Sequence, residues 1–266
     1  MFFVTSKVLM LGCFDINLVL KVIKLSDIKL ILGDCLEKFS EIPDKSVDLI
    51  ICDLPYGTTK CSWDIIIPFE DLWREWHRVS RDIHTPIVLF GVMPFICEMW
   101  SSNKKEYRHE WIWEKSRSGS AITAKYCPIK IHENILVFSK GKPNYYPIME
   151  EGEPYSRQTK NCRENNHGFG INGKMVTENK GTRFPKTIRY VKQNWSKQQQ
   201  VHPTQKPVEL LEYLIQTYSK EGDTVLDNCM GSGSTGVACK NLGRDFVGIE
   251  KEEKYFQIAK ERIESV

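Results

Sequence analysis

Residues 224–236 read TVLDNCMGSGSTG, and residues 245–250 read DFVGIE. The pattern predicts a buried strand ending on Asp227, a glycine-rich turn, a helix that reaches Leu242, and a second strand ending on Glu250. Glycines at such a turn let the backbone approach a ligand closely. An acid at the end of the second strand can accept hydrogen bonds from both hydroxyls of a ribose. The stretch therefore predicts half of a nucleoside-binding α/β fold.

The same pattern also fits a dinucleotide-binding fold. Only 16 residues follow Glu250, however, which is too few for the second half of such a domain to lie downstream. The remaining strands of the sheet must then come from upstream, so we expect the chain to be circularly permuted.

The upstream sequence DLPYG, residues 53–57, follows an apolar run at 47–52 that predicts another buried strand. A strand that stops on Asp and turns through Pro and Gly projects a carboxylate and an aromatic ring from the sheet edge, where ligands of open α/β sheets bind. The alternative is an ordinary strand-ending turn, because Asp, Pro and Gly are common turn residues. A shorter strand at 28–32 also ends beside an acid, Asp34.

The rest of the chain alternates between strand and helix patterns. The apolar spacing of FEDLWREWHRVSR, residues 69–81, predicts an amphipathic helix whose Trp residues belong to the core. Further helices are expected at 36–42, 94–101, after Pro207 and at 251–264, and further strands at 86–91, 109–114 and 132–138.

Length and composition favour one large globular domain that carries an inserted module: the chain has 266 residues, 41% of them hydrophobic and 27% charged. The net charge is +3, but residues 151–200 hold ten Lys/Arg against four Asp/Glu. From 141 to 200 periodicity fades, and aromatic residues alternate with basic ones. This composition suits phosphate contacts combined with base stacking, although a solvated loop would share it.

The nine cysteines are scattered without a C-x-x-C pair, so neither zinc nor a disulfide framework is expected, and a reducing cytosol is the natural setting. Residues 1–24 are apolar, but they lack a basic start and a small-residue cleavage site, so we interpret them as a peripheral extension. No apolar stretch is long enough to predict a membrane span.

In these motifs the sequence resembles the amino DNA methyltransferases that use S-adenosyl-L-methionine, in their permuted (β-type) order. The Asp-Pro-Pro-Tyr motif of that family corresponds to residues 53–56, and its glycine-rich loop corresponds to 227–236. The sequences GDCL at 33–36 and HPTQKP at 202–207 also match. The resemblance covers about 28–140 and 200–262.

The resemblance implies a Rossmann-like methyltransferase fold, with a mostly parallel sheet, helices on both faces and an inserted target-recognition region. The implied division of the chain is a peripheral extension at 1–24, a catalytic half at 25–140, a target-recognition insertion at 141–200 and a cofactor-binding half at 201–266. Double-stranded DNA is the implied partner, and the implied setting is the nucleoid within the cytoplasm. A homodimer and a cognate restriction nuclease stay open.

The resemblance also implies roles for individual residues. Asp53 and the carbonyl of Leu54 would accept the two N–H groups of the target amine, and Tyr56 would stack on the flipped base. Asp34 would meet the cofactor's adenine, Glu250 its ribose, and Thr204 and Lys206 its carboxylate. The catalytic set is Asp53, Leu54, Pro55 and Tyr56. The cofactor set is Asp34, Cys35, Asp53, Thr204, Lys206, Asp227, Cys229, Gly231, Ser232, Gly233, Ser234, Thr235 and Glu250. The DNA set is Lys115, Arg117, Lys125, Arg183, Lys186 and Arg189, and no metal ligands are expected.

One departure from the family is Leu54, which stands where the family has its first Pro. It keeps the backbone carbonyl but makes the turn less rigid. The leading acid favours adenine N6 as the target, while cytosine N4 stays open. Two further hypotheses also stay open: a cofactor- and DNA-binding module without turnover, and a methyltransferase that acts on RNA or on a protein amide. Asp227 could orient the loop through hydrogen bonds instead of touching the cofactor.

Overall fold

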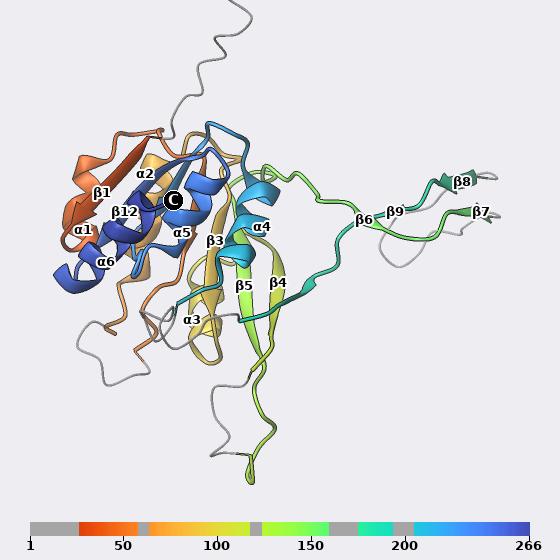
Figure 1. Cartoon of the computed structure of the whole chain (residues 1–266), viewed down its shortest axis with the longest axis horizontal. Helices are drawn as coiled ribbons and strands as arrows, with labels where there is room; N and C mark the ends of the chain where they lie inside the picture. Colours follow the sequence, from red (N-terminus) through yellow and green to blue (C-terminus); the bar gives the residue numbers. More distant parts are fainter. Residues whose placement is uncertain (1–26, 58–63, 118–123, 160–174, 194–204) are drawn as a thin grey trace, which may run out of the picture.

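The computed structural model describes residues 27–57, 64–117, 124–159, 175–193 and 205–266. An eight-stranded sheet forms its body, in the order β1-β12-β11-β2-β3-β5-β4-β10 (Figure 1). Its strands are β1 (Ile28–Leu32), β2 (Leu49–Cys52), β3 (Ile87–Gly91), β4 (Tyr107–Lys115), β5 (His132–Phe138), β10 (Ile188–Val191), β11 (Thr224–Asp227) and β12 (Asp245–Glu250). Among these strands only β5 runs against the others. The predicted mostly parallel α/β sheet is confirmed.

Helices cover both faces of this sheet (Figure 1). On one face lie α1 (Cys35–Lys38), the 3₁₀ turn η2 (Phe39–Glu41), α2 (Phe69–Val79) and α3 (Phe95–Ser102). On the other lie α4 (Val208–Tyr218), α5 (Ser234–Asn241) and α6 (Glu253–Glu264). Strand β2 is buried on both sides: Leu49 and Ile51 pack into one core, and Ile50 and Cys52 into the other. This two-sided burial explains its nearly continuous apolar sequence.

Strands β2 and β11 lie side by side, although most of the chain separates them in sequence. Val225 pairs with Leu49 and Leu226 pairs with Ile50 in parallel register. The carboxyl ends of parallel neighbours meet at one edge of a sheet, so the turn after β2 and the glycine loop after β11 lie next to each other.

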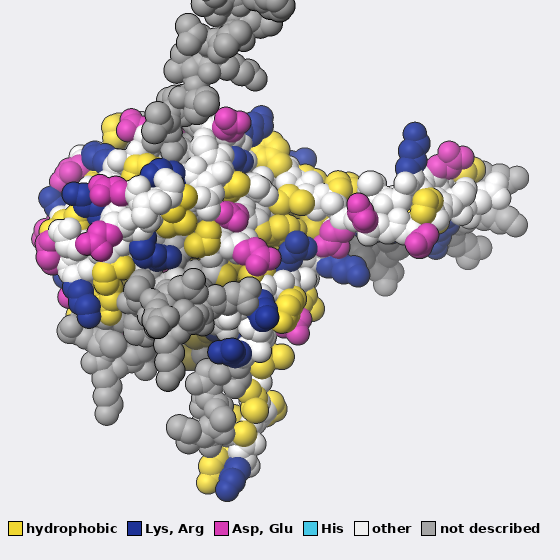
Figure 2. All heavy atoms as spheres, in the orientation of Figure 1, with side chains coloured by type: hydrophobic (Ala, Val, Ile, Leu, Met, Phe, Trp, Pro, Cys, Tyr) yellow, Lys and Arg dark blue, Asp and Glu magenta, His cyan; other side chains and the backbone are white. Residues whose placement is uncertain are grey.

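A narrow arm projects from the body (Figure 1). It consists of two antiparallel pairs, β6 (Glu150–Glu151) with β9 (Thr182–Arg183) and β7 (Tyr155–Thr159) with β8 (Met175–Asn179). Both acidic and basic side chains lie along it (Figure 2). The sequence did not predict these strands, because pairs of two to five residues with polar side chains on both sides carry no alternation. Strand β10, from the same non-periodic region, returns to the main sheet and pairs with β4.

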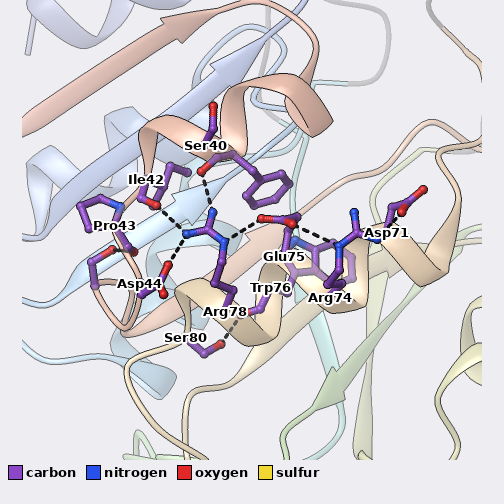
Figure 3. Close-up of polar contacts among 12 residues, drawn as sticks. Ser40, Ile42, Pro43, Asp44, Asp71, Arg74, Glu75, Trp76, Arg78 and Ser80 are labelled. Carbon is purple, nitrogen blue, oxygen red and sulfur yellow. Dashed lines mark hydrogen bonds and ion pairs between the residues drawn. The ribbon is translucent and has the colours of Figure 1, made fainter.

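Arg78 joins the segment between β1 and β2 to helix α2 (Figure 3). Its guanidinium donates to the carbonyl oxygens of Phe39 at 2.7 Å and Ile42 at 2.9 Å. It also forms ion pairs with Asp44 at 2.6 Å and Glu75 at 2.8 Å. One cation thus binds carbonyl oxygens at the start of the 3₁₀ turn and just after its end, and fixes the loop that leads into β2.

Three further observations concern only the described part of the chain. Its cysteines Cys35, Cys52, Cys97, Cys229 and Cys239 form no disulfide. None of its helices has the length and apolarity needed to cross a bilayer, and none of its His, Cys, Asp and Glu side chains form a group of three that could hold a metal ion.

Candidate active site at the carboxyl edge of the sheet

A cavity of about 490 Å³ opens where β1, β2, β11 and β12 end. Its walls carry the acids that follow these strands or end them: Asp34, Asp53, Asp227 and Glu250. The size is typical of small-molecule sites, which also occur at this edge of open α/β sheets. The cavity thus brings together the acids of motifs that are far apart in the sequence.

The turn after β2 presents Asp53 to the cavity. The Tyr56 hydroxyl donates to Asp53 Oδ1 at 2.5 Å, and the Tyr56 ring packs against Phe95 with centroids 4.9 Å apart. Leu54 is only 4% exposed and belongs to the core on the α2 side of the sheet. Gly57 N–H donates to Asp64 Oδ1 at 2.8 Å. Burial of the Leu54 side chain therefore anchors the turn at the position where the family has Pro.

Asp227 organises the glycine loop by hydrogen bonds. Its carboxylate accepts the backbone N–H of Cys229 at 3.1 Å and the hydroxyl of Thr235 at 2.6 Å. Burial raises the pKa of Asp227 to about 6, and these two donors oppose the rise. The arrangement matches the interpretation that Asp227 orients the loop.

Glu250 and Asp34 also hold backbone donors while they face the cavity. Glu250 accepts the N–H groups of Gly231 and Glu252, each at 2.8 Å. Asp34 caps helix α1 by accepting Leu36 N–H at 3.0 Å, and Lys251 donates to its other oxygen at 3.1 Å. These bonds fix the orientation of both carboxylates before any ligand arrives.

Three cysteine thiols line the cavity: Cys35, Cys52 and Cys229. Burial raises the pKa of Cys52 to about 12. A hydrogen bond to Cys229, together with burial, raises the pKa of Cys35. Thiols held in the neutral form are poor nucleophiles, so these residues act as small apolar wall groups.

The first two glycines of the loop, Gly231 and Gly233, have different surroundings. Gly231 has φ +53°, lines the cavity, and has no atom within 4 Å of the position a Cβ would take. Gly233 has φ +76°, but a Cβ there would lie 2.8 Å from Ala259 Cβ of helix α6. Gly231 thus leaves space open to a ligand. Gly233, expected to contact the cofactor, instead does not line the cavity and permits close packing of the loop on α6.

Two residues that the sequence did not single out support the loop from behind. Trp76 of α2 donates its indole N–H to Asn228 Oδ1 at 2.9 Å. Arg262 of α6 donates to the Ser232 carbonyl oxygen, and to the Ser232 hydroxyl at 2.9 Å. Their partners are brought close by the tertiary fold, so sequence spacing gives no signal for either contact.

A chain of alternating charges crosses the cavity wall from Asp53. Lys206 donates to Asp53 Oδ2, its Nζ also lies 3.4 Å from Glu133 Oε2, and Lys115 donates to Glu133 Oε1. The sequence did not single out Glu133 as a site residue, although an acid at the start of an apolar strand was a usable signal. Burial raises the pKa of Asp53, and Lys206 opposes the rise. Burial alone would lower the pKa of Lys206, but Asp53 and Glu133 outweigh it and raise the pKa.

The residues expected to bind DNA divide into two groups. Lys115 lies in the cavity wall, Arg183 stacks on Tyr155 within the arm, and Arg189 pairs with Glu150 at 2.9 Å. The other three, Arg117, Lys125 and Lys186, are exposed. Of the expected cofactor residues, Thr204 lies outside the described residues. The cavity wall includes Asp34, Cys35, Asp53, Lys206, Asp227, Cys229, Gly231, Ser232, Ser234, Thr235 and Glu250.

The mostly parallel sheet places a glycine loop and a turn that begins with Asp53 at one cavity. This arrangement defines an α/β enzyme with a nucleoside-containing cofactor. A family model described as "DNA methylase", of the N6/N4 type, matches residues 47–261. The match spans most of the chain, and the chain belongs to this DNA methylase family.

Several relatives are similar to the chain over most of its length. The type II methyltransferase M.HpaI of Haemophilus parainfluenzae is 30% identical, over 90% of this chain and 75% of the relative. The DNA adenine methyltransferase YhdJ of Escherichia coli (strain K12) is 31% identical, over 87% of this chain and 81% of the relative.

Solved structures share the fold. M1.HpyAVI in complex with SAM has a TM-score of 0.62 and 24% identity, with 89% of this chain and 98% of that chain covered. The cytosine-N4-specific PvuII DNA methyltransferase has a TM-score of 0.64 and 14% identity, with 89% and 86% covered. At these identities the likeness concerns the fold.

Proposed function

We propose that this protein transfers a methyl group from S-adenosyl-L-methionine to the exocyclic N6 of an adenine in double-stranded DNA. The observation that carries the proposal is the adjacency of the Asp53 turn and the Gly231 loop in a single cavity. Family membership makes the chain a DNA methylase.

The cavity residues fit this methyl donor. When bound, the donor supplies an electrophilic methyl group on a sulfonium sulfur. The open space beside Gly231 admits a ligand close to the backbone. Glu250, already held by two backbone N–H groups, presents a fixed carboxylate suited to ribose hydroxyls. Asp34 would contact the adenine of the cofactor, and Thr204 and Lys206 would bind the carboxylate of its methionine part.

Asp53 and Leu54 would hold the amine that attacks. The lone pair of an aromatic amine is delocalised into its ring, which makes it a poor nucleophile. Acceptance of its two N–H bonds by the Asp53 carboxylate and the Leu54 carbonyl frees the lone pair and stabilises the positive charge that develops on nitrogen. Holding the amine in this geometry also removes much of the entropic part of the barrier. Tyr56 would stack on the base, which must leave the duplex to reach the cavity.

The arm and the surrounding region 141–200 would recognise the target sequence. This region exposes Phe184 and Tyr190, 70% and 57% accessible, close in sequence to the exposed Lys186. Aromatic rings beside cations suit stacking on bases and contact with phosphates. The type II names of several relatives favour a cognate nuclease as a functional partner.

Adenine is favoured over cytosine for two reasons. The motif begins with an acid, and a relative with 31% identity is named as an adenine methyltransferase. The alternative is cytosine N4, whose amine has the same chemistry and would meet the same two acceptors.

Purified protein with radiolabelled S-adenosyl-L-methionine tests the proposal. Duplex DNA, RNA and protein are offered separately and in competition, with Asp53→Ala as the matched variant. We expect label on duplex DNA from the wild type and at least about 10³-fold less from Asp53→Ala. Label on RNA or protein alone, or full activity of Asp53→Ala, would refute it.

A further inference from the structure

Glu133 has one buried carboxylate oxygen that accepts no hydrogen bond within the described part of the chain. The residue is the second of β5, is 9% exposed and lines the cavity. Lys115 donates to Oε1, whereas Oε2 is buried and has no hydrogen-bond partner among the residues that the structure describes. A buried acceptor without a donor is costly, so such an atom points to a donor that arrives in another state of the site.

Lys206 forms an ion pair with that oxygen. Its Nζ lies 3.4 Å from Glu133 Oε2 while it donates to Asp53 Oδ2. The ammonium carries three donors on a flexible stem, so a small shift would exchange one carboxylate for the other. Lys206 is 8% exposed and contacts both acids, and its three N–H donors leave one for the cofactor carboxylate.

The present position of Lys206 is unfavourable for the reaction at Asp53. Tyr56 already occupies Oδ1, and Lys206 occupies Oδ2. An amine that attacks a sulfonium methyl gains positive charge, and an ammonium in contact with the same carboxylate opposes that charge. Asp53 therefore accepts the target amine best when the Lys206 ammonium has moved away from it.

We propose that Glu133 is a positioning residue that takes Lys206 from Asp53 when the target amine arrives. The inference rests on the proposed function. In the exchange Asp53 Oδ2 accepts a hydrogen bond from the amine, and Glu133 Oε2 accepts one from the Lys206 ammonium. No proton is transferred. The exchange therefore gives the buried Glu133 Oε2 a donor and leaves Asp53 Oδ2 free to accept the target amine.

The ionisation of the two groups supports this geometry. Burial tends to raise the pKa of Glu133, but Lys206 and Lys115 outweigh it and lower the pKa. The pKa of Lys206 is raised by the two acids that flank it. Both groups thus carry their charges at neutral pH, as the exchange requires.

Glu133→Gln, measured at saturating DNA and cofactor, separates the positioning role from a structural one. We expect a single-turnover rate about 10- to 100-fold below wild type with cofactor affinity little changed, and a lower melting temperature because Lys115 and Lys206 lose a buried ion-pair partner. Glu133→Asp should recover part of the rate because it keeps the charge. Glu114→Gln, on the neighbouring strand outside the cavity wall, is the matched control and should keep the wild-type rate.

A crystal structure of the wild type with target duplex and S-adenosylhomocysteine gives a second readout. We expect Lys206 Nζ within about 3.2 Å of Glu133 Oε2 and out of contact with Asp53 Oδ2. Lys206 still on Asp53 or on neither acid, or an active wild type whose rate Glu133→Gln leaves unchanged, would overturn the inference alone. A wild type that methylates no DNA would refute the proposed function, and this inference with it.

Discussion

Trp76 donates its indole N–H to Asn228 Oδ1 across 2.9 Å, although 152 positions separate the two residues. Trp76 is fully buried in helix α2, and Asn228 begins the glycine loop after β11. A core side chain of the upstream half of the chain thus supports the loop of the downstream half.

Trp76→Phe should therefore weaken both folding and cofactor binding. Loss of the donor leaves a buried amide oxygen unpaired, which costs about 1–3 kcal/mol of the free energy of unfolding. Because the loop loses its support, we also expect weaker binding of S-adenosyl-L-methionine by calorimetry. Trp73→Phe is the control, since Trp73 donates to Ser102 at 2.9 Å, away from the loop. Equal cofactor affinity in the two variants would contradict this account.

The two glycines of the loop should respond differently to alanine. Gly233→Ala combines a left-handed backbone with a Cβ 2.8 Å from Ala259, and should cost about 3 kcal/mol of unfolding free energy. Gly231→Ala meets no atom within 4 Å, so its cost should be about 1 kcal/mol. Its Cβ enters the cavity, however, and should lower cofactor affinity at least about tenfold. Urea unfolding and calorimetry on both variants check the contrast, and a reversed order would contradict it.

Asp227 should make the folded state less stable as the pH rises. Burial raises its pKa from 3.8 to about 6, so the folded state binds this proton more tightly than the unfolded chain. The contribution is fully present below about pH 4 and is lost as the pH rises through about 6, a total of about 3 kcal/mol.

Asp227→Asn removes this titration. Without cofactor, its unfolding free energy relative to wild type should increase by about 2 kcal/mol between pH 4.5 and 7.5. Urea unfolding across that range measures the difference. Parallel pH profiles for the two proteins would show that the carboxyl does not titrate in this way.

Much of this site could be predicted because its acids follow or end strands. Asp53, Asp227 and Glu250 each come at the end of an apolar run, and the carboxyl ends of parallel strands share one edge. The same reasoning misses Glu133 because it lies near the start of β5, the strand that runs against its neighbours, so its position at this edge depends on topology.

The arm and the loop supports could not be predicted for other reasons. The paired strands of the arm are short and polar, so they lack the periodicity that identifies strands. The support from Arg262 depends on how α6 packs against the glycine loop, which no local pattern encodes. The charge of Lys115 predicts a DNA-binding cation, yet the fold turns this side chain toward Glu133.

Mass spectrometry of nucleosides tests the central claim most directly. DNA is isolated from cells that lack their own DNA methylation and express either the wild type or Asp53→Ala, and is digested to nucleosides. The account predicts N6-methyldeoxyadenosine with the wild type and its absence with Asp53→Ala. N4-methyldeoxycytidine in its place, no methylated nucleoside, or equal amounts from both proteins would contradict it.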